Sequence, residues 1–198
     1  MDLHVVGEEP PERGDAARNR QRVLVAANEL LHSCGAEALT MDALAERAGV
    51  GKGTIFRRFG SRAGLMRALV NESEIDLQRR IVFGPPPLGP GTDPISRLAA
   101  FGPAVLETLE LHGAVILAGQ TKPGARYEHP AYQFQLTHVL MLLRQARAAG
   151  DHRLLAESLL ATIDVPLVRF QRNQLGMSLD RLGAHWEWLV RATVQSPS

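Results

Sequence analysis

Two short helical patterns joined by a turn that begins at Gly49 constrain this sequence more than any other feature. The first pattern begins at Thr40, whose hydroxyl can cap a free backbone N–H group, and it continues from about Met41 to Ala48. A glycine just past a helix end adopts a left-handed backbone conformation without steric cost, so Gly49 allows the chain to turn sharply. A second helix is predicted from about Lys52 to Phe59. The spacing therefore predicts a helix-turn-helix.

The second short helix carries the residues that suit a DNA partner. Ile55 and Phe59 lie four positions apart and are expected to point inward, which leaves polar and basic residues on the outer faces for a major groove. Ser61 is expected to cap the next helix, where Arg62 in the first turn can meet a phosphate. An ordinary helical hairpin with a solvated basic edge is the alternative interpretation. The predicted DNA-binding residues are Thr40, Lys52, Gly53, Thr54, Phe56, Arg57, Arg58 and Arg62.

The segment from Leu39 to Leu65, LTMDALAERAGVGKGTIFRRFGSRAGL, resembles the DNA-binding segment of the tetracycline-repressor (TetR) family of one-component transcription regulators. The resemblance implies that the second short helix enters the major groove, that an aromatic residue in it contacts the DNA backbone, and that a lysine opening the fourth helix binds a phosphate. These last two roles fall on Phe56 and Arg62. The family usually has Tyr and Lys there, so Phe56 lacks the hydroxyl for a phosphate hydrogen bond, whereas Arg62 keeps the charge.

Charge is distributed unevenly along the chain, although the net charge is only +1. Residues 1–12 carry four acidic residues and no Lys or Arg, giving −4. Residues 13–80 carry 12 Lys/Arg and 8 Asp/Glu, giving +4, and residues 81–198 carry 10 and 9, giving +1. The basic excess coincides with the predicted DNA-binding part. Arg13, Arg18, Arg20 and Arg22 are candidates for phosphate or minor-groove contacts, with a solvated basic tail as the open alternative.

The whole sequence predicts an all-α fold, with an N-terminal three-helix, helix-turn-helix DNA-binding domain and a C-terminal helical bundle for effector binding and dimerisation. We expect a disordered arm over residues 1–15, the DNA-binding domain over 16–62, a connecting helix over 63–83 and the ligand-binding and dimerisation domain over 84–198. Apolar residues at three- and four-residue intervals predict the first helix over 16–33, ended by Gly35. The domain boundary is expected in the proline-rich loop 84–91, because proline removes amide donors and fixes backbone angles.

Beyond Thr92 the patterns are helical and strand signals are almost absent. Helices are predicted over 95–112 with a kink or break at Gly102-Pro103, over 114–120, over 131–149, over 151–174 with a kink at Pro166, and onward from 178.

The last two long helices carry more apolar surface than two peripheral helices of one subunit should need. A partner subunit explains this surface, and a self-contained core is the alternative from the residues alone. The resemblance implies a four-helix dimer interface, and a dimer can present two recognition helices to an inverted repeat with half-sites about 34 Å apart. The predicted dimer residues are Leu155, Leu159, Ile163, Leu182, Trp186 and Leu189.

The resemblance also implies a small-molecule effector among the helices of the second domain. The candidates are Phe101, Leu109, Ile116, Tyr132, Phe134, His138, Met141 and Phe170, for which plain core packing is the alternative interpretation. Among them His138 is the favoured ligand contact, because a polar ring in an apolar pattern can hydrogen-bond a ligand.

Other function classes find little support. No metalloprotease, phosphate-loop, dinucleotide or nucleophile motif accompanies the histidines His112, His129, His138 and His152, so no enzyme, cofactor or metal is expected. The single cysteine, Cys34, is expected to be a small buried residue. With no apolar run of about 18 residues and no secretory signal, we expect a cytoplasmic protein without a membrane span.

These patterns together predict a DNA-binding transcriptional regulator, a ligand-responsive repressor that binds an inverted-repeat operator as a homodimer. The alternatives are a helical protein-binding adaptor and a small-molecule-binding protein without specific DNA recognition.

Overall fold

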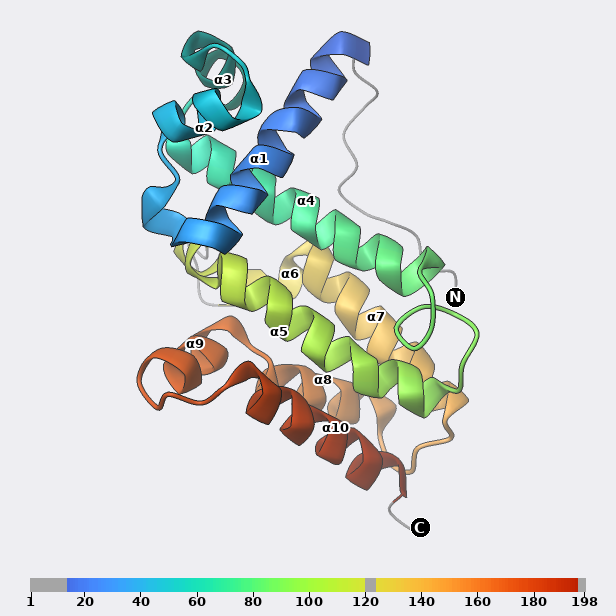
Figure 1. The fold of residues 1–198 in the computed structure, drawn as a ribbon. Coiled ribbons are helices and arrows are strands. Elements are labelled where there is room, and N and C mark those ends of the chain that lie inside the picture. Colours follow the sequence, from blue (N-terminus) through green and yellow to red (C-terminus); the bar gives the residue numbers. More distant parts are fainter. Residues whose placement is uncertain (1–13, 120–123, 196–198) are drawn as a thin grey trace. The chain divides into compact units, whose positions relative to one another are not determined.

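The computed structural model describes residues 14–119 and 124–195, so most of the arm expected over residues 1–15 lies outside the described part. Within these ranges the chain forms helices and no strand, which confirms the all-α prediction (Figure 1). The helices are α1 (Gly14–Ala38), α2 (Met41–Ala48), α3 (Lys52–Phe59), α4 (Arg62–Phe83), α5 (Pro94–Gly119), α6 (Ala125–Glu128), α7 (Pro130–Gln145), α8 (His152–Thr162), α9 (Val165–Asn173) and α10 (Leu179–Gln195).

The chain divides into a smaller compact unit that ends at Ser73 and a larger one that begins at Glu74. The division falls inside α4, whereas the sequence suggested the proline-rich loop that follows this helix. The apolar side chains of α4 explain the difference. Leu77 and Ile81, near its C-terminal end, belong to the hydrophobic core of the larger unit.

In the smaller unit α1 packs on α2, and α2 packs on α3. Buried apolar side chains of α1 face those of the short helices, and the helix-turn-helix is thus held on a third helix, as predicted. Two expectations for α1 are wrong. The helix does not end at Gly35 but continues to Ala38, because a glycine ends a helix only where the backbone turns there. Cys34, which was expected to be buried, is exposed.

The larger unit is built around α5, which contacts α7, α9 and α10. The break predicted at Gly102-Pro103 does not occur, and α5 continues through Pro103 to Gly119. Trp186 of α10 packs at this point, and a Cβ atom on Gly102 would lie 2.2 Å from the Trp186 ring. The Trp186 indole also donates a hydrogen bond of 2.8 Å to the carbonyl of Leu98. Gly102 therefore admits the indole instead of ending the helix.

Pro166 lies at the start of a helix where a kink was predicted. The expected helix over 151–174 is split into α8 and α9, with Pro166 in the first turn of α9. Proline is favourable in a first turn, where its missing N–H group has no partner to lose, and unfavourable inside a helix. Asp151 caps α8 as expected, since its carboxylate accepts from the amides of Arg153 and Leu154.

By length and apolar content alone, one helix of the described residues, α5, is able to cross a membrane, over Pro94–Leu117. Nearly half of the stretch is buried inside the larger unit, against α7, α9 and α10. Its apolar composition is accounted for by its place in the core.

Candidate nucleic-acid interface

The turn between α2 and α3 has the geometry that its sequence predicts. The Thr40 hydroxyl accepts a hydrogen bond of 3.1 Å from the amide of Ala43 and so caps α2. Gly49 has φ 63° and ψ 39°, the left-handed conformation, and its N–H group closes the last turn of α2. Arg22 of α1 donates to the carbonyl of Ala48 at 2.9 Å, which ties the end of α2 to the supporting helix. The turn is therefore fixed by local backbone chemistry and by one long side chain.

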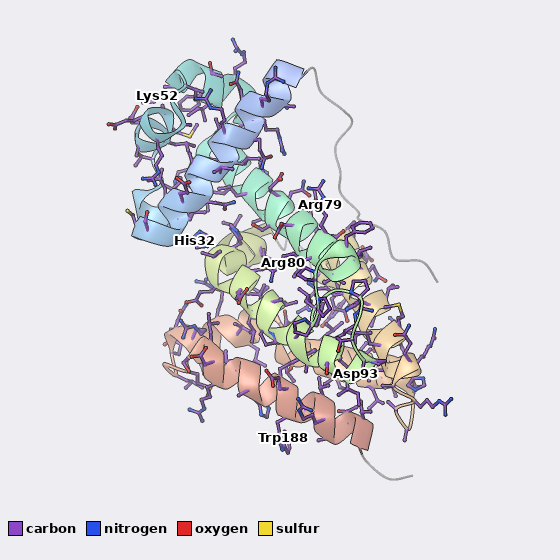
Figure 2. All side chains as sticks on the ribbon, turned by 45° about the vertical axis from the view of Figure 1, so that its right-hand side comes forward. His32, Lys52, Arg79, Arg80, Asp93 and Trp188 are labelled. Atoms are coloured by element: carbon purple, nitrogen blue, oxygen red, sulfur yellow. The ribbon has the colours of Figure 1, made fainter. Side chains whose placement is uncertain are left out.

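α3 is held from beneath by Ile55, which is completely buried. The outward side chains include Arg57 and Arg58, both exposed, and Phe56, whose side chain is 42% exposed. Lys52 projects from the first turn of α3 (Figure 2) and forms an exposed ion pair with Asp42 of α2 at 2.7 Å. The result is a helix with an anchored inner face and a positively charged outer face.

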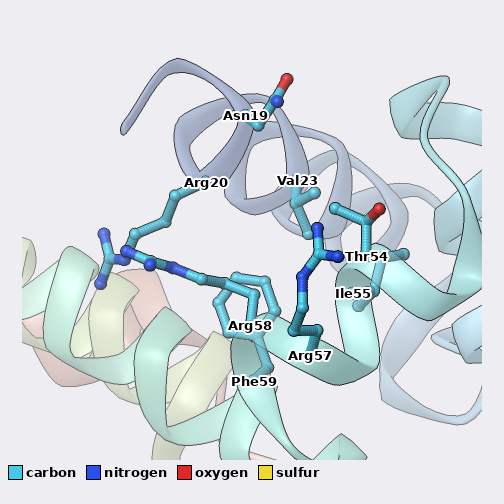
Figure 3. A pocket seen from close by; sticks show the side chains of 8 residues that line it. All are labelled: Asn19, Arg20, Val23, Thr54, Ile55, Arg57, Arg58 and Phe59. Atoms are coloured by element: carbon cyan, nitrogen blue, oxygen red, sulfur yellow. The ribbon is translucent and has the colours of Figure 1, made fainter. Parts of the chain in front are cut away.

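A groove of about 350 Å³ runs between α1 and α3 (Figure 3). Its walls carry three guanidinium groups, from Arg20, Arg57 and Arg58. Arg20 is held by an ion pair with Glu72 at 3.3 Å, whereas Arg57 forms no hydrogen bond or ion pair with any other described residue. The remaining lining residues are Asn19, Val23, Thr54, Ile55 and Phe59.

Glycines at the start of α3 leave its backbone uncovered by side chains. A Cβ atom on Gly51 or Gly53 would meet no other atom within 4 Å, and neither residue has a positive φ. Neither packing within the smaller unit nor backbone conformation requires glycine at these positions. A surface without side chains allows another backbone, such as that of DNA, to approach closely.

The predicted DNA-binding residues fall into two groups. Lys52, Gly53, Phe56, Arg57 and Arg58 are exposed on α3, and Thr54 is half-buried at the groove. Two further candidates already have roles within the fold. The Thr40 hydroxyl is the α2 cap, and the Arg62 guanidinium donates to the carbonyl of Leu39 at 3.0 Å.

The α1 side of this interface was predicted only in part. Arg20 and Arg22, expected in a basic arm and at the start of the first helix, bind Glu72 and the carbonyl of Ala48 within the smaller unit. Asn19 and Val23, which line the groove, were not predicted at all. The available signal was the amphipathic pattern of the first helix, in which Asn19 and Val23 lie one turn apart.

Comparison with known proteins agrees with this geometry. Residues 23–69 match the model of bacterial regulatory proteins of the tetR family, and this range includes α2, α3 and the supporting part of α1. The chain therefore carries a DNA-binding domain of the TetR family over these residues. It is a DNA-binding transcriptional regulator, and its other helices share the fold of solved regulators.

Individual TetR-like relatives are distant in sequence. The nucleoid occlusion factor SlmA of Haemophilus influenzae is 24% identical over 181 residues, which cover 84% of this chain and 82% of SlmA. A regulator from Saccharomonospora viridis, solved in complex with choline, has a TM-score of 0.67 at 20% identity, covering 88% of this chain and 96% of its own. NalD, the secondary repressor of the MexAB-OprM multidrug efflux pump in Pseudomonas aeruginosa, has a TM-score of 0.54 at 19% identity. The match covers 93% of this chain and 100% of NalD. The two structures share the fold of this chain.

Most of the predicted effector residues lie in or against the hydrophobic core of the larger unit: Phe101, Leu109, Ile116, Tyr132, Phe134 and Met141. Phe101 and His138 lie together in the core, with ring centroids 5.4 Å apart. His138 is 0% exposed, both of its ring nitrogens lack a partner among the described residues, and burial lowers its pKa to about 3, with the nearby Arg97 charge contributing. Tyr132 also lines a cavity beside α6, and Phe170 is 52% exposed on α9, so it is not part of a buried site. The other candidates are buried or half-buried: Leu109, Ile116, Phe134 and Met141.

Half of the predicted dimer residues are enclosed by their own subunit. Leu159, Ile163 and Trp186 are buried in the core of the larger unit, and Trp186 is only 1% exposed. They cannot face a partner while this core is intact, which corrects their assignment to an interface. Leu155, Leu182 and Leu189 are half-buried against the same core. The outward apolar side chains of these helices are Leu154 on α8 and Trp188 on α10, 61% and 62% exposed.

Proposed function

We propose that this chain represses transcription as a homodimer that binds an inverted-repeat operator, and that a small molecule held in the larger unit changes its affinity for DNA. The observation that carries the DNA part is the outer face of α3, where exposed Arg57 and Arg58 flank a groove and Gly53 leaves room for a backbone. Arginines on such a helix can bind base edges bidentately or neutralise phosphates. We place the protein in the cytoplasm, where it meets DNA.

Homodimerisation follows from the length of the recognition helix. α3 has eight residues, which read only a few base pairs, and a second copy related by a two-fold axis supplies the second half-site. Leu154 on α8 and Trp188 on α10 are the large apolar side chains that these two helices expose, and contact with a second copy would remove them from water.

Repression and response to a small molecule are supported by two structures of the same fold, since NalD is a repressor and the S. viridis regulator was solved with choline. Within this chain, Phe101 and His138 remain the candidates for an effector contact in the core, and Tyr132 is the candidate that lines a cavity. Repression rests on this likeness of fold alone, because no residue pattern in the chain distinguishes a repressor from an activator.

The test is to recover an operator from random genomic fragments and to measure its affinity for the Arg57→Ala and Arg58→Ala variants. A lost base contact weakens binding by roughly tenfold or more and changes the sequence preference, whereas a lost phosphate contact weakens all sequences alike. Arg144→Ala is the matched control, because it removes one exposed positive charge from α7 in the larger unit. Equal operator affinity in all three variants and the unmodified chain would reject α3 as the recognition helix.

A further inference from the structure

Arg126 of α6 sits in an enclosure of aromatic and acidic side chains in the larger unit. Its guanidinium carbon lies 5.2 Å from the ring centroid of Tyr127 and 5.1 Å from that of Tyr132. The two rings meet edge to face, with centroids 5.2 Å apart. The guanidinium also forms an ion pair with Asp164. Two aromatic faces and one carboxylate are the groups that recognise organic cations.

A cavity of about 290 Å³ adjoins this cation. Sites for small molecules commonly have volumes of roughly 300–1,000 Å³, so this cavity suits a ligand of few atoms. Its lining comes from α6, α7, α8 and the start of α9, and consists of Arg126, Tyr127, Tyr132, Gln133, Arg153, Glu157, Ala161 and Asp164.

The charges of the lining are balanced only while Arg126 is in place. Arg126 and Arg153 contribute two positive charges, and Glu157 and Asp164 contribute two negative charges, which sum to zero. Arg153 forms its own ion pair with Glu157 at 2.5 Å. Without the Arg126 guanidinium the lining carries one net negative charge, centred on Asp164, and a single monovalent cation restores neutrality.

Two of the three walls of the enclosure come from longer helices, whereas the third wall, Tyr127, lies on the same short helix as Arg126. Tyr132 is buried on α7, and Asp164 is fixed at the start of α9, where its carboxylate forms no capping hydrogen bond to that helix. Arg126 comes from α6, which has four residues. An incoming cation therefore meets a fixed aromatic and acidic wall on one side and a short element on the other.

We propose that this enclosure is a binding site for a small organic cation of the quaternary ammonium type, and that Arg126 is a built-in competitor for it. A quaternary ammonium ion has no hydrogen-bond donors, so it depends on the aromatic faces and the carboxylate that now hold the guanidinium. This inference rests on the proposed effector response and names the chemical class of the effector. The ligand enters when the Arg126 side chain swings out, while Tyr127 and Tyr132 stay in place.

The test is calorimetric titration of tetramethylammonium chloride into four folded proteins, with sodium chloride at matched ionic strength as the blank. If Arg126 occupies the enclosure about 90% of the time, its removal strengthens binding by about tenfold, since the apparent Kd is the intrinsic Kd divided by the competent fraction. Arg126→Ala and Arg126→Gln are expected to show this gain. Arg153→Ala changes the charge of the same cavity equally but leaves the enclosure filled, so no gain is expected.

A Tyr132→Leu change in the Arg126→Ala background removes the buried ring and should weaken binding by roughly three- to thirtyfold. Folded Arg126 variants that bind tetramethylammonium no better than the unmodified chain, or a Tyr132 change without effect, would overturn the site.

Operator binding is measured in parallel. A lower operator affinity of the Arg126→Ala variant in tetramethylammonium supports the effector role. An unchanged affinity despite bound cation rejects that role, and absent operator binding by the unmodified chain would reject the proposed function while the calorimetric result stands.

Discussion

Gly53 occupies a helical position on α3 at which no neighbouring atom excludes a side chain. Glycine inside a helix costs about 0.5–1 kcal/mol relative to alanine, because it loses more backbone freedom on folding. A partner that approaches the bare backbone gives a reason to retain it. The absent side chain is thus a feature of the binding face and has no role in the packing of the smaller unit.

The Gly53→Ala variant should accordingly be more stable by about 0.5–1 kcal/mol and bind operator DNA more weakly, because the new methyl group enters the face that DNA approaches. Urea unfolding and operator titration measure the two effects. Gly113→Ala on α5 is the control, since its Cβ would make only ordinary contacts, the nearest at 3.5 Å. Full operator affinity in Gly53→Ala would show that DNA stays away from this part of α3.

His138 is a second residue whose environment sets a measurable property. Burial lowers its pKa to about 3, while an unfolded chain has an ordinary histidine pKa near 6.5. Between these values the unfolded state binds the proton and the folded state does not. Its contribution to stability is therefore present above about pH 6.5 and is lost as the pH falls toward 3, by up to about 1.4 kcal/mol per pH unit.

A His138→Leu variant removes two ring nitrogens that have no partner among the described residues and keeps a similar volume. We expect equal or higher stability at pH 7 and a smaller loss of stability between pH 6.5 and 4, followed by urea unfolding at each pH. The exposed His32→Gln variant should retain the acid sensitivity of the unmodified chain. If the stability of the His138→Leu protein depended on pH as that of the unmodified chain does, His138 would not be the source of the acid sensitivity.

At the scale of the element, the α2–α3 turn depends on the left-handed backbone of Gly49. A Gly49→Val variant should lose more than about 1 kcal/mol of stability and most of its operator affinity, because a β-branched residue is strained at a φ of 63°. Its Cβ would also lie 3.1 Å from the Arg22 guanidinium and disturb the bond to Ala48. Gly49→Asn is the matched variant, since asparagine tolerates this conformation. Equal loss in both would place the cause outside the backbone.

Elements governed by local chemistry were predictable from the sequence. The cap at Thr40, the turn at Gly49 and the extent of α3 depend on neighbouring residues, and each has its predicted form. The helix break predicted at Gly102-Pro103 was wrong because Gly102 makes room for the indole of Trp186, which lies more than 80 positions away along the chain. The same limit applies to the interface, where the groove between α1 and α3 exists only once the two helices pack.

At the scale of the whole molecule, the distinction between Trp186 and Trp188 decides how dimerisation should be tested. Trp186 belongs to the core, so replacing it would unfold the larger unit and reveal nothing about a partner. Trp188→Glu instead places a charge on the exposed face of α10 and should give a folded monomer, because an unpaired charge is costly to bury between subunits.

Sedimentation measures this outcome, and circular dichroism verifies the fold. Leu175→Glu, at an apolar position between α9 and α10 that is 52% exposed, should leave the dimer intact. A protein that sediments as a monomer before any substitution would reject the dimer. Operator affinity of the Trp188→Glu monomer should fall toward that for a single half-site, since the second recognition helix is no longer held nearby.

Trp186 and Trp188 are the two tryptophans of the chain, and they stand two positions apart on one helix, one enclosed and one in water. Their fluorescence should therefore separate into a short-wavelength component that iodide does not quench and a long-wavelength component that it does. Unfolding exposes the first, while subunit association shields the second. A single titration with iodide thus reports on the integrity of the core and on the association of subunits as two independent signals, without any label added to the protein.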